Sequence, residues 1–187
     1  MSIKDIDHLE KFRQFLQLET EFRTGICNGN GYCHLSVRNK HLWETLNSKG
    51  CTPCKSLTLK FPNTDIFKDV TLINDFIRGY VDGDGCLTSY QKKNSIVTEL
   101  NLVGTESFLM SVRDYLQQPG YIRNKSCKNY SNQAFSLQYS NLPSRIIARR
   151  LYGKATIYLQ RKYNKYKYFC QLEEESSRRK SSKNGEG

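Results

Sequence analysis

The chain has 187 residues and carries 29 lysines and arginines against 18 aspartates and glutamates, a formal net charge of +11. No run of 18 or more apolar residues occurs, which excludes a transmembrane helix, and the first nine residues lack the apolar segment of a signal peptide. Seven cysteines, an odd number without a secretory signal, argue against a disulfide framework. We therefore expect a soluble intracellular protein, whose host compartment (cytoplasm or organelle) the sequence does not identify.

The first part of the chain predicts a helix, a hairpin and a second helix. Residues 6–18 (IDHLEKFRQFLQL) have the periodicity of an amphipathic helix. Residues 21–39 divide into two strands at Asn28-Gly29-Asn30-Gly31, where either Asn-Gly pair can form a hairpin turn. A short helix over 40–48 follows, and Lys55 comes shortly after it.

A link over residues 57–71 leads to another apolar helix at about residues 72–83. Phe76 and Tyr80 are spaced for one side of this helix, and Gly79 lies between them. Glycine costs about 1 kcal/mol relative to alanine inside a helix, so its presence favours a place where another backbone comes close. We expect Phe76, Gly79 and Tyr80 to form a helix-packing interface.

Two carboxylates follow at the carboxyl end of this helix, in the run Val81-Asp82-Gly83-Asp84-Gly85. That end is the negative pole of the helix dipole, which repels Asp82 and Asp84, so a cation is their natural counterion. A solvated Gly-Asp-Gly turn would contain the same residues, because Asp and Gly are common in turns for backbone reasons alone. Whether the run binds metal or is an ordinary turn depends on the chain around it.

The segment after this run predicts a second series of elements. They are strands near 85–91 and 95–104, a helix over 105–117, strands over 120–128 and 133–140, and a helix over 142–152. From the helix at 105–117 onward, the order repeats that of the first part of the chain. The matching positions, at offsets of 100, 102 and 107, are Leu16 with Leu116, Leu35 with Leu137, and Lys55 with Lys162.

The positive charge is concentrated in one segment. Residues 115–172 contain 11 lysines and arginines and no acidic residue, whereas the segments before and after carry equal numbers of both signs. A charged surface is normally mixed in sign, so this segment indicates a surface that binds a polyanion. Nucleic acid is the favoured partner, and an acidic protein or membrane lipid is the alternative.

The run from Ile77 to Gly85 resembles the nine-residue signature of the LAGLIDADG homing endonucleases, with Ile77 and Arg78 where Leu and Ala are usual. The resemblance implies an α+β fold of that type, an antiparallel β-sheet saddle with packed helices. Residues 71–172 would then form a complete repeat, and residues 1–70 a partial repeat without its signature helix and first hairpin. The tail at 173–187 lacks apolar residues and is predicted to be disordered.

The resemblance also implies site-specific, homing-type cleavage of double-stranded DNA with a divalent metal, Mg²⁺ or another divalent cation, as for nucleases of mobile introns. Asp84 would be the metal ligand together with the backbone of Gly83, since Mg²⁺ prefers carboxylate and carbonyl oxygens. Asp82 would help to hold the helix end. Lys162 and Lys55, at matching ends of the two repeats, are the candidate basic catalytic residues, and for Lys162 the alternative is membership of the general basic segment.

Proteins of this family read DNA with antiparallel strands laid along the major groove, which admits a β-ribbon. The side chains that would reach the duplex therefore lie on the predicted strand pairs. They are Tyr90, Gln91, Lys92, Lys93, Arg123, Lys125, Lys128, Gln133, Gln138, Arg23 and Arg38.

The family's active centre lies between two signature helices that each give one acid, and this chain contains one such helix. A second copy paired through Gly79, or a partner chain, can supply the other helix. Pairing of two copies is awkward, because the partial repeat of each would compete for the same packing surface. Otherwise the chain is a truncated or decayed endonuclease, or an intron maturase, that binds nucleic acid without cutting it; intron RNA is then a further partner.

Overall fold

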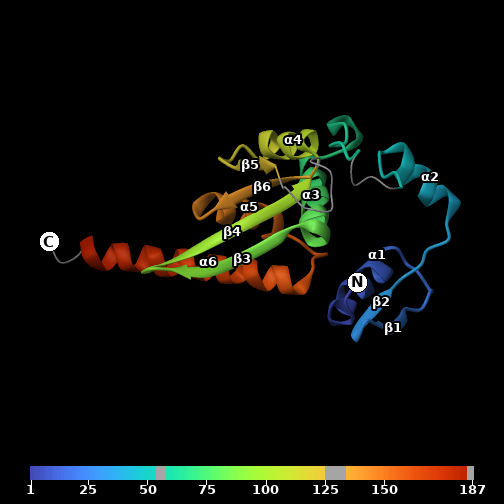
Figure 1. The fold of residues 1–187 in the computed structure, drawn as a ribbon, viewed down its shortest axis with the longest axis horizontal. Coiled ribbons are helices and arrows are strands. Elements are labelled where there is room, and N and C mark those ends of the chain that lie inside the picture. The colour runs from blue at the N-terminus through green and yellow to red at the C-terminus, as the bar shows by residue number, and fades with distance from the viewer. Residues whose placement is uncertain (54–57, 125–133, 185–187) are drawn as a thin grey trace.

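The computed structural model describes residues 1–53, 58–124 and 134–184, and Figure 1 shows the course of the chain. The elements are, in chain order, η1 (Ile3–Asp5), α1 (Ile6–Phe15), β1 (Arg23–Cys27), β2 (Asn30–His34), α2 (Lys40–Ser48), η3 (Thr64–Ile66), α3 (Val70–Asp84), β3 (Cys86–Lys92), β4 (Ser95–Gly104), α4 (Glu106–Leu116), β5 (Tyr121–Asn124), β6 (Phe135–Ser140), α5 (Leu142–Tyr152) and α6 (Gln160–Asn184). No helix of these residues is long and apolar enough to cross a membrane.

The N-terminal part (residues 1–53) contains a two-stranded antiparallel sheet, in which Cys27 of β1 pairs with Asn30 of β2. Asn28 and Gly29 form the turn, with φ of 49° and 76°. Positive φ at both central residues is the requirement of a type I′ turn, which explains why an Asn-Gly pair stands there. The second strand ends at His34, earlier than the predicted end at residue 39.

This N-terminal part has almost no core of its own. Among its residues, His8 and Cys33 are the two that are buried. Phe15 of α1, within the predicted amphipathic helix 6–18, is 68% exposed, and α2 buries no residue. The amphipathic pattern therefore predicted the helices correctly, but the apolar sides of these helices are largely uncovered in this chain.

The C-terminal part (residues 58–184) is built on a four-stranded antiparallel sheet of order β3-β4-β6-β5. Alternate residues of the central strands, such as Leu100, Leu102 and Leu137, are fully buried in one core with residues of α3, α4, α5 and α6. The four helices therefore cover one face of the sheet and leave the other face open (Figure 1). The predicted elements from residue 72 to residue 152 are found within a few positions of their expected bounds where the structure describes them, and residues 125–128 of the predicted strand 120–128 lie outside the described residues.

The prediction of a disordered tail at 173–187 is corrected by the structure, because α6 continues through this segment to Asn184. The first half of α6 is anchored in the core through Phe169 and Leu172. A helix that is already nucleated extends at little further cost, and no glycine or proline interrupts the sequence before Gly185. Absence of apolar residues therefore indicated a lack of packing, and not a lack of helix; residues 185–187 lie outside the described chain.

Candidate active site and nucleic-acid interface

The carboxyl end of α3 is held by Lys162, which is 3% exposed. Its Nζ donates to the backbone carbonyl of Val81, and to those of Asp82 and Gly85 at 2.8 Å each. The last carbonyls of a helix have no partner within the helix, and an ammonium has three N–H donors, so Lys162 uses all of its donors as a cap on α3. Burial lowers the pKa of Lys162, the nearby charge of Arg161 lowers it further, and Asp82 opposes this.

Asp82 is buried, at 7% exposure, and points into the C-terminal part. Its carboxylate accepts hydrogen bonds from the hydroxyl of Tyr152 at 2.6 Å and from the backbone N–H of Leu159 at 3.0 Å. Burial and the neighbouring charge of Asp82 raise the pKa of Tyr152. Asp82 thus ties α3 to the end of α5 and to the segment before α6, and both of its carboxylate oxygens are engaged in these hydrogen bonds.

Arg78 occupies a place where the signature usually has alanine, and this residue is 8% exposed. Its guanidinium donates to the carbonyls of Ile157 at 2.9 Å and Leu151 at 3.3 Å, and pairs with Asp75 at 2.6 Å. The arginine therefore fastens α3 to the segment that Asp82 also holds. This contact explains the departure from the signature in structural terms.

Asp84, in contrast, is exposed, and within the described part of the chain no hydrogen bond or ion pair engages its carboxylate. The pKa of Tyr80 is raised to about 12, mainly by burial of Tyr80 itself and secondly by the negative charge of Asp84. The described residues contain no group of three or more His, Cys, Asp or Glu that could hold a metal ion. Mg²⁺ is commonly bound through one or two carboxylates with substrate phosphates completing its shell, so a free carboxylate such as Asp84 fits one ligand of such a site.

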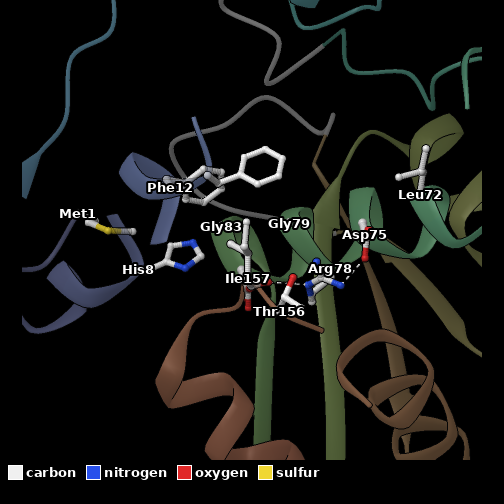
Figure 2. A pocket seen from close by; sticks show the side chains of 12 residues that line it. Met1, His8, Phe12, Leu72, Asp75, Arg78, Gly79, Gly83, Thr156 and Ile157 are labelled. Atoms are coloured by element: carbon white, nitrogen blue, oxygen red, sulfur yellow. Dashed lines mark hydrogen bonds and ion pairs between the residues drawn. The ribbon is translucent and has the colours of Figure 1, made fainter. Parts of the chain in front are cut away.

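Beside α3 lies an open cavity of about 450 Å³, shown in Figure 2. Gly79 and Gly83 line it, and a Cβ built on either would meet no atom within 4 Å. In Figure 2, Met1, His8 and Phe12 lie on the α1 side of the cavity, facing these glycines. Gly79 and Gly83 therefore face space that no residue of the described chain fills.

Two of the three residues predicted to form a helix-packing interface, Phe76 and Tyr80, contact the core of the C-terminal part. Phe76 packs against Phe61 and Phe108, and the hydroxyl of Tyr80 donates to the carbonyl of Val103 at 2.6 Å. Both rings therefore belong to the core of the C-terminal part, because they continue the helix side that carries other core residues. Of the three predicted residues, Gly79 alone lies on the open side of α3.

The open face of the sheet carries part of the predicted DNA-contacting set. Alternation from the buried Leu87 and Leu100 places Tyr90, Lys92 and Gln138 on this face. Gln91 belongs to the opposite face by the same alternation, and Lys93 lies in the turn with a φ of 52°.

Other members of the predicted set lie elsewhere. Arg23 begins β1 and Arg38 precedes α2, both exposed and both outside the four-stranded sheet. Arg123 lies in β5, paired with Ser136 of β6. Lys55, Lys125, Lys128 and Gln133 lie outside the described residues.

Sequence reasoning missed several polar and aromatic residues of the open face. The strand register aligns one residue from each of the four strands in a row across the open face. A second row contains one residue from each of β3, β4 and β6. Strict alternation from the buried leucines would have found these positions. They are Cys86, Asn101 and Tyr121 beside Gln138, and Thr88, Glu99 and Ser140.

Comparison with solved structures defines the fold. I-GzeII, a LAGLIDADG homing endonuclease crystallised with its DNA target, matches with a TM-score of 0.58 at 14% identity, over 94% of this chain and 80% of that chain. I-LtrWI, a LAGLIDADG homing endonuclease bound to target DNA, matches with a TM-score of 0.54 at 12% identity, over 92% of this chain and 76% of that chain. The chain therefore has the fold of LAGLIDADG homing endonucleases, and the predicted fold class is confirmed.

The homing endonuclease I-CvuI, in complex with its target, also matches, with a TM-score of 0.43 at 16% identity. This match covers 55% of the chain and spans 66% of the length of I-CvuI. Neither a scan against protein-family models nor a search of curated proteins finds a match to the sequence.

Proposed function

We propose that this chain belongs to the LAGLIDADG homing-endonuclease family and takes part in site-specific, metal-dependent cleavage of double-stranded DNA. The observation that carries the proposal is the end of α3. Asp82 and Lys162 are buried there in hydrogen bonds, while Asp84, two residues from Asp82, is exposed. Such an arrangement fixes a helix end and leaves one carboxylate available to a metal and a phosphate.

In the proposed site, Asp84 and the backbone carbonyl of Gly83 hold the divalent cation, which supplies activation of water and stabilisation of the leaving oxygen. Lys162 acts as a positioning residue, because its three donors are engaged by backbone carbonyls and none is left for a phosphate. Lys55 remains the candidate for a basic residue near the scissile bond. The duplex lies along the open face of the sheet, where Tyr90, Lys92 and Gln138 project.

The second acid of the proposed site comes from a second copy or from a partner chain. The cavity beside Gly79 and Gly83 supports this, because it is lined by the apolar side chains of Phe12, Phe15 and Leu72 and is open at the glycines. A helix with small residues would pack closely there. The partial repeat at 1–70 and the complete repeat at 71–172 are proposed on the same grounds, since the N-terminal part lacks the elements that would complete its core.

A second candidate function is nucleic-acid binding without cleavage, as in an intron maturase or a decayed endonuclease. The specific observation in its favour is that the described residues offer one exposed carboxylate at the α3 end and no cluster of metal ligands. Intron RNA would then be a partner beside DNA.

A plasmid-library cleavage assay with Mg²⁺ separates the two functions, with the natural chain compared to Asp84→Asn. Cleavage by the natural chain and its loss in Asp84→Asn, with DNA binding retained, would support the endonuclease. Absence of cleavage by both proteins, together with salt-sensitive DNA binding, would favour the non-catalytic binder. Light scattering on the same samples shows whether the active species holds one copy or more.

A further inference from the structure

Within the described part of the acid-free segment 115–172, three basic residues lie on the far side of the sheet from its open face. Helix α5 buries Ser144, Ile147 and Ala148 against the covered face of the sheet. Arg149 and Arg150, on the exposed side of α5, therefore point away from the sheet, and Lys154 follows one turn later. Arg149, Arg150 and Lys154 together form the α5 basic surface.

The α5 basic surface borders a cavity of about 420 Å³ between α5 and the start of α3. One acid, Asp75, is among the described residues that line this cavity, and it is paired with Arg78 at 2.6 Å. Arg149 forms an ion pair with Glu173, which is not among the residues that line this cavity, so the unpaired positive charges at the cavity are those of Arg150 and Lys154. The remaining charge at the cavity is positive, which is the condition for binding an anion.

The side chain of Arg150 is preorganised for binding an anion. Its Nε donates to the side-chain oxygen of Asn74 at 2.9 Å, and its guanidinium lies 4.5 Å from the centre of the Tyr115 ring. These contacts reduce the side-chain freedom that binding would otherwise remove, and they leave the terminal N–H groups for a phosphate. Lys154 is exposed, and no contact with another described residue engages its ammonium.

We propose that the α5 basic surface binds the phosphodiester backbone of a nucleic-acid strand other than the duplex on the sheet. The two surfaces lie on opposite sides of the β3-β4-β6-β5 sheet, so a straight duplex on the open face does not reach Arg149, Arg150 or Lys154. Arginines that present several donors, next to a flexible lysine, match phosphate oxygens and carry no base-specific geometry. The site is independent of whether Asp84 cuts DNA.

The test is a fluorescence-anisotropy titration of the full chain with labelled single-stranded RNA, single-stranded DNA of the same sequence, and duplex DNA. The variant carries Arg149→Gln, Arg150→Gln and Lys154→Gln together. Its matched control removes the same charge elsewhere on exposed side chains, through Lys40→Gln, Lys49→Gln and Lys60→Gln. Because Arg150 also contacts α3, Lys154→Glu alone repeats the test without altering a packed group.

We expect the triple variant to bind single strands about tenfold more weakly than the control. The slope of log K against log salt should fall in magnitude by about 2, because each phosphate of a single strand that a basic side chain neutralises contributes about 0.7. Duplex affinity should change less than twofold, and saturating duplex should not displace the strand. Loss with RNA alone assigns the strand as RNA, and equal loss with both assigns backbone recognition without sugar preference.

Three results would overturn the proposal. The first is that the triple variant and Lys154→Glu both bind single strands with an affinity within twofold of that of the control. Another is an equal loss of duplex affinity, which would make the surface part of the duplex site. The third is competition by poly-glutamate as effective as that by RNA, which would assign the surface to an acidic protein segment.

Discussion

The N-terminal and C-terminal parts contain similar elements, yet they differ in what those elements bury. In the C-terminal part, α4 and the hairpin after it pack with α3 and β3-β4 into one core. In the N-terminal part, α1 and the β1-β2 hairpin have neither a helix like α3 nor a second hairpin to pack against, and apolar residues such as Phe15 and Ile26 are exposed. The difference indicates that the signature helix organises the core of its own half as well as carrying the acids.

The largest effect should come from separating the two parts. A fragment of residues 58–187 should fold cooperatively, because it keeps the core and the packing of Phe61 against Phe76 and Phe108. A fragment of residues 1–53 should be unfolded alone, since it buries two residues. Circular dichroism with urea titration measures both. A cooperative transition in the 1–53 fragment would contradict this account.

Two phenylalanines sharpen the same comparison. Phe108 is fully buried in the C-terminal core, so Phe108→Ala should lower the free energy of unfolding by about 3–5 kcal/mol. Phe15 is 68% exposed on α1, so Phe15→Ala should change it by less than about 0.5 kcal/mol. Urea denaturation of the two variants tests the pair. A large loss in Phe15→Ala would show that the N-terminal part is packed by a second copy.

The two aspartates at the end of α3 should separate stability from activity. Asp82→Asn replaces a buried carboxylate that accepts two hydrogen bonds, so we expect a loss of about 1–3 kcal/mol in the free energy of unfolding. Asp84→Asn, at an exposed position, should change this free energy by less than about 0.5 kcal/mol. Thermal melts of both variants measure the contrast, and equal losses would contradict the assigned roles.

The smallest expected effect is on alkaline stability. The pKa of Tyr80 is raised to about 12, first by burial and second by the charge of Asp84. The pKa of a tyrosine in an unfolded chain is about 10. Between these values the folded chain binds more protons than the unfolded chain, so stability falls as pH rises through this window. Tyr80→Phe should make that fall shallower in urea titrations between pH 9 and 11. An unchanged slope would show that Tyr80 does not hold its proton.

The sequence predicts the elements well where their signals are local. The bounds of α2 and α5 agree with the predicted 40–48 and 142–152, and the side chain of Asn39 caps α2 as a helix start of this type requires. The turn at Asn28-Gly29 follows equally from backbone chemistry. The length of α6 could not be predicted in this way, because its second half continues from a packed helix and has no apolar pattern of its own.

The candidate site was less accessible to sequence reasoning. The free carboxylate of Asp84 follows from the signature, but the engagement of Lys162 does not, since its acceptors are backbone carbonyls that leave no mark in the sequence. The inward direction of Phe76 and Tyr80 was within reach, because they border the helix side of the buried Ile73 and Ile77. Strand alternation would likewise have separated Gln91 from Tyr90.

The cap on α3 joins atoms 80 residues apart in the sequence, between Lys162 and the carbonyl of Asp82. A chain synthesised from its N-terminus completes α3 long before Lys162 exists, and contacts of such separation form late because a long loop must close first. Until the start of α6 docks, the carbonyls of Asp82 and Gly85 lack their lysine donor and remain hydrated. The carboxyl end of α3, and with it Asp84, should therefore reach its final position in the last stage of folding, and slow amide exchange at Gly85 should report that docking.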